Sequence, residues 1–126
     1  MVTVSLWVLL GSAIGGLARY WTGVWVAGWA GTEFPWGTLL INILGSFVIG
    51  LVGAGVAERG WSTTPVDLRA FVMVGLCGGF TTFSAFSLQT LELLQAGRHG
   101  AAIAYTASSV TACIVMVWGG WMLGRA

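Results

Sequence analysis

Four long stretches of this 126-residue chain are almost free of charge, and they decide which kind of fold it can adopt. No Asp, Glu, Lys or Arg interrupts residues 37–57, 70–91 or 100–124, and residues 4–30 contain only Arg19. A helix needs about 20 consecutive apolar residues to cross the hydrocarbon core of a bilayer. The sequence therefore predicts an all-α membrane protein, a single domain over residues 1–126 with four transmembrane helices in the lipid bilayer.

The approximate spans are residues 4–30, 37–57, 70–95 and 100–124, and the third contains an interruption. Residues 75–84 read Gly-Leu-Cys-Gly-Gly-Phe-Thr-Thr-Phe-Ser, so three glycines in five residues precede paired threonines. An opened helix exposes carbonyl and N–H groups at bilayer depth, which is tolerated only where protein buries them or a polar path runs past them. We expect a third helix that is broken mid-membrane, with carbonyls freed near Gly78 and Gly79 beside an ion or small-solute site.

Composition excludes several classes of function. The net charge is +1 and there is no lysine, so nothing indicates a nucleic-acid partner. Cys77 and Cys113 both fall inside apolar stretches, where we interpret them as small packing residues. No Ser-His-Asp set, metal cluster or phosphate-binding loop is present, and His99 stands alone in a connection. The sequence indicates that the protein is not an enzyme.

The arginines give only a weak signal for orientation in the membrane. Arg59, Arg69 and Arg125 are expected on one side, with Arg19 and Arg98 on the other. Because the excess of Arg and Lys on one side normally sets the orientation, this near balance would allow insertion both ways and pairing of two opposite copies. Four short helices also make a thin bundle around any polar path, so we expect an oligomer.

Polar side chains recur at helical spacing in the second and fourth spans. Thr38, Asn42 and Ser46 follow one another at steps of four and share one face. The Asn42 amide must find partners in hydrocarbon, either as a contact between helices or as a donor to a solute. In the fourth span Tyr105 and Ser109 are four apart, where their hydroxyls extend a polar track or bond to their own helix.

Two aromatic residues follow the glycine interruption. Phe83 and Phe86 are three apart, so they are neighbours on a helix that restarts there. Ring edges carry partial positive charge and can face a small anion, although both rings can also simply pack against lipid or helix. A restarted helix presents a positive N-terminus, which favours anions, and freed carbonyls favour a small cation. Arg19, the one charge inside a span, either draws anions to a vestibule or reaches the headgroups.

Three motifs together resemble those of the Fluc (CrcB-like) fluoride channels, and the resemblance covers essentially the full length. They are Gly-Gly-Leu-Ala-Arg at residues 15–19, Gly-Thr-Leu-Leu-Ile-Asn at residues 37–42 with Gly-Ser following at 45–46, and Gly-Leu-Cys-Gly-Gly-Phe-Thr-Thr-Phe-Ser-Ala-Phe-Ser at residues 75–87. The last is long and unusual, and it carries most of the weight. The resemblance implies a fluoride-selective channel in a microbial plasma membrane that passively exports cytoplasmic fluoride and so reduces its toxicity.

The resemblance also implies an assembly and a set of site residues. The assembly is an antiparallel dual-topology homodimer with two pores and a structural Na⁺ at its centre, bound by backbone carbonyls of Gly78 and Thr81 and their dimer mates. The fluoride pathway would contain Asn42, Phe83, Phe86, Ser84, Thr38, Tyr105, Ser109 and Gln89, with Arg19 near the vestibule. Similar sequences often have a glutamate at the position of Gln89, which cannot ionise, so any step that needs a carboxylate there is in doubt.

Two other functions fit part of the sequence. A small four-helix proton-coupled multidrug exporter needs a membrane-embedded glutamate in its first helix, and residues 4–30 contain none. A non-transporting assembly subunit, held together by small residues such as Gly11 and Gly15, would leave the interruption and the polar faces unexplained.

Overall fold

The computed structural model describes the whole chain, Met1–Ala126, and almost all of it is helical. The elements are α1 (Val2–Ala30), α2 (Trp36–Arg59), α3 (Val66–Arg69), the π-helix η1 (Ala70–Cys77), α4 (Gly78–Phe80), α5 (Phe83–Gln95) and α6 (His99–Gly124). The helices α1, α2 and α6, and the run from α3 to α5, are each long and apolar enough to cross a membrane. The prediction of four membrane-spanning segments is confirmed.

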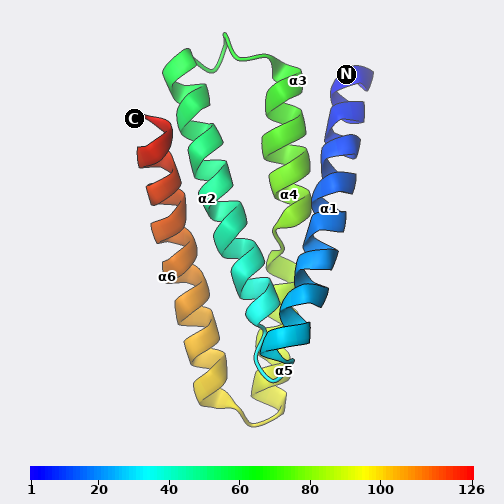
Figure 1. The fold of residues 1–126 in the computed structure, drawn as a ribbon, viewed down its shortest axis with the longest axis vertical. Helices are drawn as coiled ribbons and strands as arrows, with labels where there is room; N and C mark the ends of the chain where they lie inside the picture. The colour runs from blue at the N-terminus through cyan, green and yellow to red at the C-terminus, as the bar shows by residue number, and fades with distance from the viewer.

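The helices associate as two pairs that are joined near one end of the molecule. The most extensive contacts are between α2 and α6 and between α1 and η1 (Figure 1). With an even number of crossings, both termini lie at the same end, at the top of Figure 1. Gly31, Gly60 and Gly97 follow the ends of α1, α2 and α5. All three have positive φ, which lets the chain turn away from the helix axis.

The third span is built from four pieces rather than one continuous helix. It begins at Val66, four residues before the predicted start, and passes through η1 before the helical α4. The break itself occupies Thr81 and Thr82, whose ψ angles of 159° and 116° are extended. The break lies inside the interruption predicted over residues 75–84, although the chain remains helical through Gly78 and Gly79. The carbonyls of Gly78 and Gly79 still lack helical donors, because the helix ends at Phe80 just after them.

The glycines of this span serve close helix packing instead. A Cβ on Gly75 would lie 2.9 Å from the Cα of Gly11, and a Cβ on Gly79 would lie 2.8 Å from the Ser12 carbonyl oxygen. Gly15 similarly faces the main chain of Leu76. Backbones that approach this closely are typical of small-residue faces in membrane helices. The glycine face therefore seats α1 against the segment that leads into the break.

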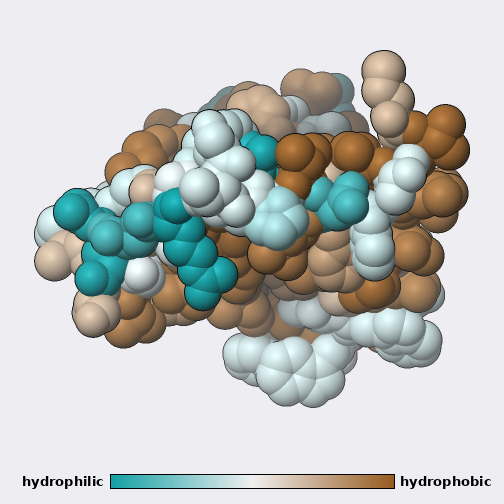
Figure 2. All heavy atoms as spheres, turned by 90° about the horizontal axis from the view of Figure 1, so that it is seen from above, coloured by the Kyte–Doolittle hydropathy of each residue, from teal (hydrophilic) through white to brown (hydrophobic).

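Few residues are buried within the single chain. Only 20 of the 126 residues are buried, and most large apolar side chains face outward. Figure 2, a view from the end that carries both termini, shows hydrophilic residues gathered over part of that end and apolar residues over much of the remaining surface. A compact apolar cluster of Leu39, Phe86, Leu93, Ala102 and Tyr105 joins α2, α5 and α6. Such an exposed apolar surface requires lipid or a second chain to cover it.

Candidate functional site

Asn42 reaches the break from the second turn of α2 and bonds to its main chain. The Asn42 Nδ2 donates a 3.0 Å hydrogen bond to the Thr82 carbonyl, and the Thr82 N–H donates a 2.8 Å hydrogen bond to Asn42 Oδ1. The side-chain amide thus pairs with the main chain of Thr82 in the way a neighbouring strand would. One N–H of the Asn42 amide remains free of this pairing, because an amide nitrogen has two donors.

The adjacent Thr81 is anchored by α1. Arg19 NH1 donates to the Thr81 carbonyl at 3.3 Å, while the N–H and hydroxyl of Thr81 both donate to the Cys77 carbonyl, at 2.9 and 2.8 Å. An arginine inside a membrane span needs a partner of this kind. Arg19 therefore has an acceptor inside the protein.

The extended residues separate two helix ends that would otherwise satisfy each other. The Thr82 N–H, which would bond the Gly78 carbonyl in a continuous helix, is turned to Asn42. The last carbonyls of α4 therefore face a region without their usual donors. At the start of α5, the Thr82 hydroxyl caps the helix by accepting from the Ala85 N–H at 3.2 Å. Carbonyl oxygens and a positive helix N-terminus thus lie on either side of the break.

A cavity of about 390 Å³, here called the narrow cavity, lies beside the break. Its lining includes Asn42, Gly78, Thr81, Phe83, Phe86 and Ser109. The Ser109 residue is 6% exposed, and its buried hydroxyl has no hydrogen-bond partner in the chain. A buried hydroxyl without a partner is costly and calls for a ligand or a water. The narrow cavity therefore combines a free amide N–H, an unpaired hydroxyl and two aromatic rings.

The two phenylalanines have different surroundings. Their ring centroids are 5.3 Å apart with planes inclined by 46°. Phe86 is buried and packs on Tyr105 at a centroid distance of 5.1 Å, whereas Phe83 is 76% exposed on the surface of the single chain. A second molecule or lipid must cover Phe83.

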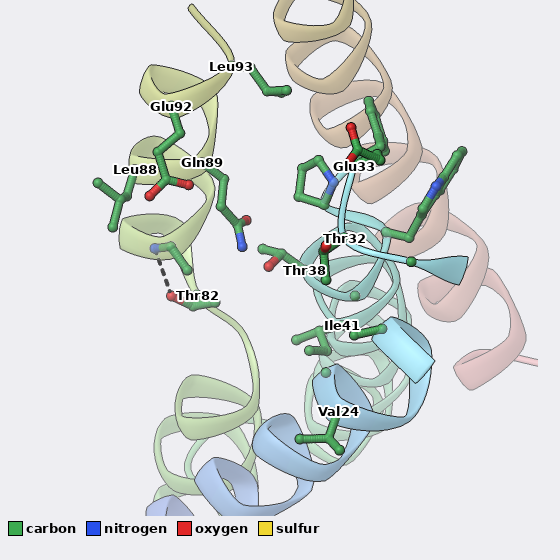
Figure 3. A pocket seen from close by; sticks show the side chains of 18 of the residues that line it. Val24, Thr32, Glu33, Thr38, Ile41, Thr82, Leu88, Gln89, Glu92 and Leu93 are labelled. Carbon is green, nitrogen blue, oxygen red and sulfur yellow. Dashed lines mark hydrogen bonds between the residues drawn. The ribbon is translucent and has the colours of Figure 1, made fainter. Parts of the chain in front are cut away.

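A second and larger space of about 980 Å³, here called the wide cavity, opens at the end of the molecule that carries the connections near Glu33 and Arg98. Figure 3 shows Gln89 and Glu92 of α5 on one side of it and Thr38 and Ile41 of α2 on the other. Arg19 and Ser84 also line it. The Arg98 guanidinium donates to the Glu33 carbonyl and lies 3.8 Å from the Glu33 carboxylate, so these two residues tie two connections together at the mouth.

Tyr105 fixes the wall of the wide cavity. Its ring is fully buried between Phe34 and Phe86, and its hydroxyl donates a 3.0 Å hydrogen bond to Gln89 Oε1. This contact satisfies the acceptor oxygen of Gln89. In Figure 3 the amide nitrogen of Gln89 is directed toward Thr38. Gln89 therefore presents a neutral donor to the wide cavity.

The structure divides the residues singled out from sequence between these two spaces. Asn42, Phe83, Phe86, Ser109, Gly78 and Thr81 line the narrow cavity, and Arg19, Thr38, Ser84 and Gln89 line the wide one. Tyr105 lines neither cavity, but its hydroxyl bonds to Gln89, which lines the wide one. Sequence reasoning did not single out Thr82, which is the only residue that lines both. The sequence signal for Thr82 was that Thr81 and Thr82 form a pair of threonines shortly after the glycines.

Comparison with known proteins gives the family of this chain. Residues 6–121 match the family model described as CrcB-like protein, Camphor Resistance (CrcB). The chain belongs to the CrcB family. A relative from Methylocella silvestris is 49% identical over 121 residues, covering 96% of this chain and 92% of its own, and one from Paramagnetospirillum magneticum is 49% identical over 118 residues, covering 94% and 91%. A third, from Rhodospirillum rubrum, is 50% identical over 113 residues, covering 90% and 88%.

All three relatives are named fluoride-specific ion channel FluC. The expected family is therefore confirmed. With its four membrane-spanning segments, this CrcB member is a multi-pass protein of the bacterial plasma membrane.

Proposed function

We propose that this CrcB protein is a fluoride-selective channel that lets cytoplasmic fluoride leave the cell passively. The proposal is carried by the narrow cavity, where the free N–H of Asn42, the unpaired Ser109 hydroxyl and the two phenylalanine rings converge. The names of the relatives support fluoride as the ion. The wide cavity supplies a polar mouth with Arg19 and the Gln89 amide on its walls.

The chemistry of these groups suits a small, strongly hydrated anion. A pore must replace the water that fluoride loses, yet full positive charges in the narrow part would bind it too tightly for release. Neutral donors and the positive edges of aromatic rings meet both demands. Arg19, the arginine beside the break, stands outside the narrow cavity and is already bonded to Thr81. Its charge can attract anions into the wide cavity without trapping them at the narrowest point.

The functional unit we propose is an antiparallel dual-topology homodimer. Phe83 and Gly78 line the narrow cavity and are nevertheless exposed on the single chain, so this space is incomplete without a neighbour. Arg59, Arg69 and Arg125 lie at the end that carries the termini, and Arg19 and Arg98 lie toward the other end, so the excess is a single arginine. Such a weak charge bias favours neither orientation strongly.

A structural Na⁺ bound to carbonyl oxygens of Gly78 and Thr81, with the same pair from a second copy, completes the proposal. The residues present fit a hard cation, which prefers oxygen ligands. Gly78 begins α4 one turn before the break, its carbonyl lacks the Thr82 N–H as a helical donor, and both residues line the same cavity. When bound, the ion would supply fixed positive charge beside the anion path.

The test is fluoride efflux from liposomes that contain the purified protein, followed with a fluoride-selective electrode. We expect fluoride to leave and chloride to stay. Phe83→Ile and Phe86→Ile should each slow the flux at least tenfold while the protein remains assembled. Leu123→Ile, at an exposed position that lines neither cavity, is the apolar control and should conduct normally. Unchanged flux in both phenylalanine variants would remove the rings from the path.

A further inference from the structure

We infer that Asn42 is chiefly a positioning residue, which holds the main chain of Thr82 as the partition between the two cavities. This inference rests on the proposed function, because the partition matters only if an ion crosses it. It assigns a specific task to the pair of hydrogen bonds between Asn42 and Thr82, here called the Asn42–Thr82 clamp. A residue that only offered a donor to a passing ion would need neither bond.

The clamp gives the Thr82 N–H the acceptor that it otherwise lacks. In a continuous helix this N–H would bond to the Gly78 carbonyl, and the extended backbone prevents this. Asn42 Oδ1 accepts from it at 2.8 Å, and Asn42 Nδ2 donates at 3.0 Å to the Thr82 carbonyl, which is also the N-cap carbonyl of α5. Only a primary amide offers an oxygen acceptor and an N–H donor side by side at this reach, which explains why an asparagine is needed.

The clamp matters for transport because Thr82 lies between the two cavities. Thr82 alone lines both the wide and the narrow cavity. Thr38 and Ile41, which precede Asn42 on α2, line the wide cavity, whereas Asn42 and Gly45 line the narrow one. The main chain at Thr82 therefore separates the two spaces. Its conformation sets the width of the passage between them.

Neighbouring contacts reinforce the same segment from its other side. Arg19 bonds to the carbonyl of Thr81, and the Thr82 hydroxyl caps α5. A Cβ on Gly45 would collide with the Thr81 side chain, so α2 lies directly against the break at this point. The clamp is thus the central one of three ties, and it is the only one that holds the main chain of Thr82.

The decisive experiment removes the Thr82 N–H and leaves the Asn42 side chain intact. Because the same ester makes the Thr81 carbonyl a weaker acceptor for Arg19 and for the proposed Na⁺, efflux is recorded at saturating Na⁺ and compared with that of Arg19→Met made the same way. Native ligation at Cys77 joins residues 1–76 to a synthetic 77–126 in which Thr82 is replaced by its α-hydroxy acid, so an ester oxygen replaces the amide N–H. We expect the full-length ester protein to conduct fluoride at least tenfold more slowly than the all-amide protein made the same way. Flux equal to that of the all-amide protein would overturn the inference.

Hydrogen exchange gives a readout that does not depend on conduction. In the intact protein in nanodiscs, the Thr82 N–H should exchange slowly, and Asn42→Ala should speed its exchange at least tenfold. Asn42→Asp keeps the acceptor and should protect this N–H more than Asn42→Ala does. Leu44→Ala, on an exposed position of the same helix, is the control and should change nothing. Equal exchange at Thr82 in Asn42→Ala and the unaltered protein would contradict the clamp.

The two readouts separate this inference from the proposed function. If the unaltered protein carried no fluoride while Thr82 exchange still depended on Asn42, the channel assignment would fail and the clamp would stand as a structural device. If the protein conducted fluoride, lost flux in Asn42→Ala and kept full flux as the ester, Asn42 would act on the ion directly and the clamp would be wrong.

Discussion

The hydroxyl of Tyr105 donates a 3.0 Å hydrogen bond to Gln89 Oε1, so the one polar atom of a fully buried ring sets the orientation of a side chain in the wide cavity. The bond leaves the amide N–H groups of Gln89 available to an anion. A glutamine remains neutral at every pH, and this donor therefore has constant strength. Fluoride passage by this chain should consequently show little dependence on ionisation at position 89.

Gln89→Glu tests that consequence. Tyr105 can donate to a carboxylate as it does to the amide oxygen, but the second oxygen would then face the wide cavity as an acceptor. We expect fluoride efflux to fall as the pH rises and the introduced carboxylate ionises, because a negative charge repels the anion. The measurement is electrode-recorded efflux between pH 4 and 8, a range that begins near the ordinary glutamate pKa of about 4.3.

Gln89→Met is the control for this series, since it keeps the length and removes both polar groups. Its flux should be reduced equally at all pH values. A Gln89→Glu protein with the same flat pH profile would show that position 89 does not meet the ion.

Arg19 should influence both the break and the entry of anions. Arg19→Met removes the bond to the Thr81 carbonyl and the only charge inside the first span. We expect slower efflux that is most evident at low fluoride concentration, where attraction of anions into the wide cavity matters most. Arg19→Lys keeps the charge on a shorter reach and should recover part of the flux. The measurement is the concentration dependence of efflux at constant ionic strength, because salt screens the attraction.

Much of this architecture was readable from the order of residues. Charge-free stretches gave the four spans, because a membrane crossing needs little more than length and apolar character. Spacing gave only the residues that share a face of one helix, and the resemblance to a known family gave the expectation that Asn42, Phe83 and Ser109 lie beside one path. A π-helix over residues 70–77 had no recognisable signal, since its hydrogen bonding differs from that of an α-helix without a distinct composition.

The site of the break shows why the remainder could not be read from sequence. Glycines such as Gly78 and Gly79 permit a helix to open, but they also permit close helix packing. In the structure Gly79 packs closely against Ser12 of α1 and remains helical. Within the predicted range of residues 75–84, the opening lies at the two threonines, where Arg19 and Asn42 bond to the main chain. Those partners are 62 and 40 residues away, so only the tertiary structure reveals them.

The two phenylalanines should differ in their effect on the stability of the chain and on its assembly. Phe86→Ala removes a buried ring from contact with Tyr105 and should cost about 3–5 kcal/mol of unfolding free energy. Phe83→Ala removes an exposed ring and should leave the fold of the single chain intact while weakening the proposed dimer. Unfolding in mixed detergent measures the first effect, and counting subunits in sparse vesicles measures the second. Equal dimer affinity in Phe83→Ala and the unaltered protein would place Phe83 against lipid.

Two pairs of adjacent glycines, Gly15 with Gly16 and Gly119 with Gly120, should respond oppositely to substitution by alanine. A Cβ on Gly15 would collide with the Leu76 carbonyl, whereas a Cβ on Gly16 has nothing within 4 Å. Gly120 and Gly119 repeat the contrast on α6, where only Gly120 faces the main chain of Phe47. We expect Gly15→Ala and Gly120→Ala each to destabilise the protein by about 1–3 kcal/mol, because neither neighbour is a flexible side chain that could move aside.

The adjacent substitutions Gly16→Ala and Gly119→Ala should be neutral or slightly stabilising, since alanine exceeds glycine in helix propensity by about 1 kcal/mol. Thermal unfolding in one detergent, with fluorescence of the tryptophans as the signal, compares all four proteins directly. Because each pair shares its helix and nearly its depth in the membrane, a general effect of alanine would move both members together. Equal losses within a pair would show that the close approach of α1 to η1, or of α2 to α6, does not limit stability.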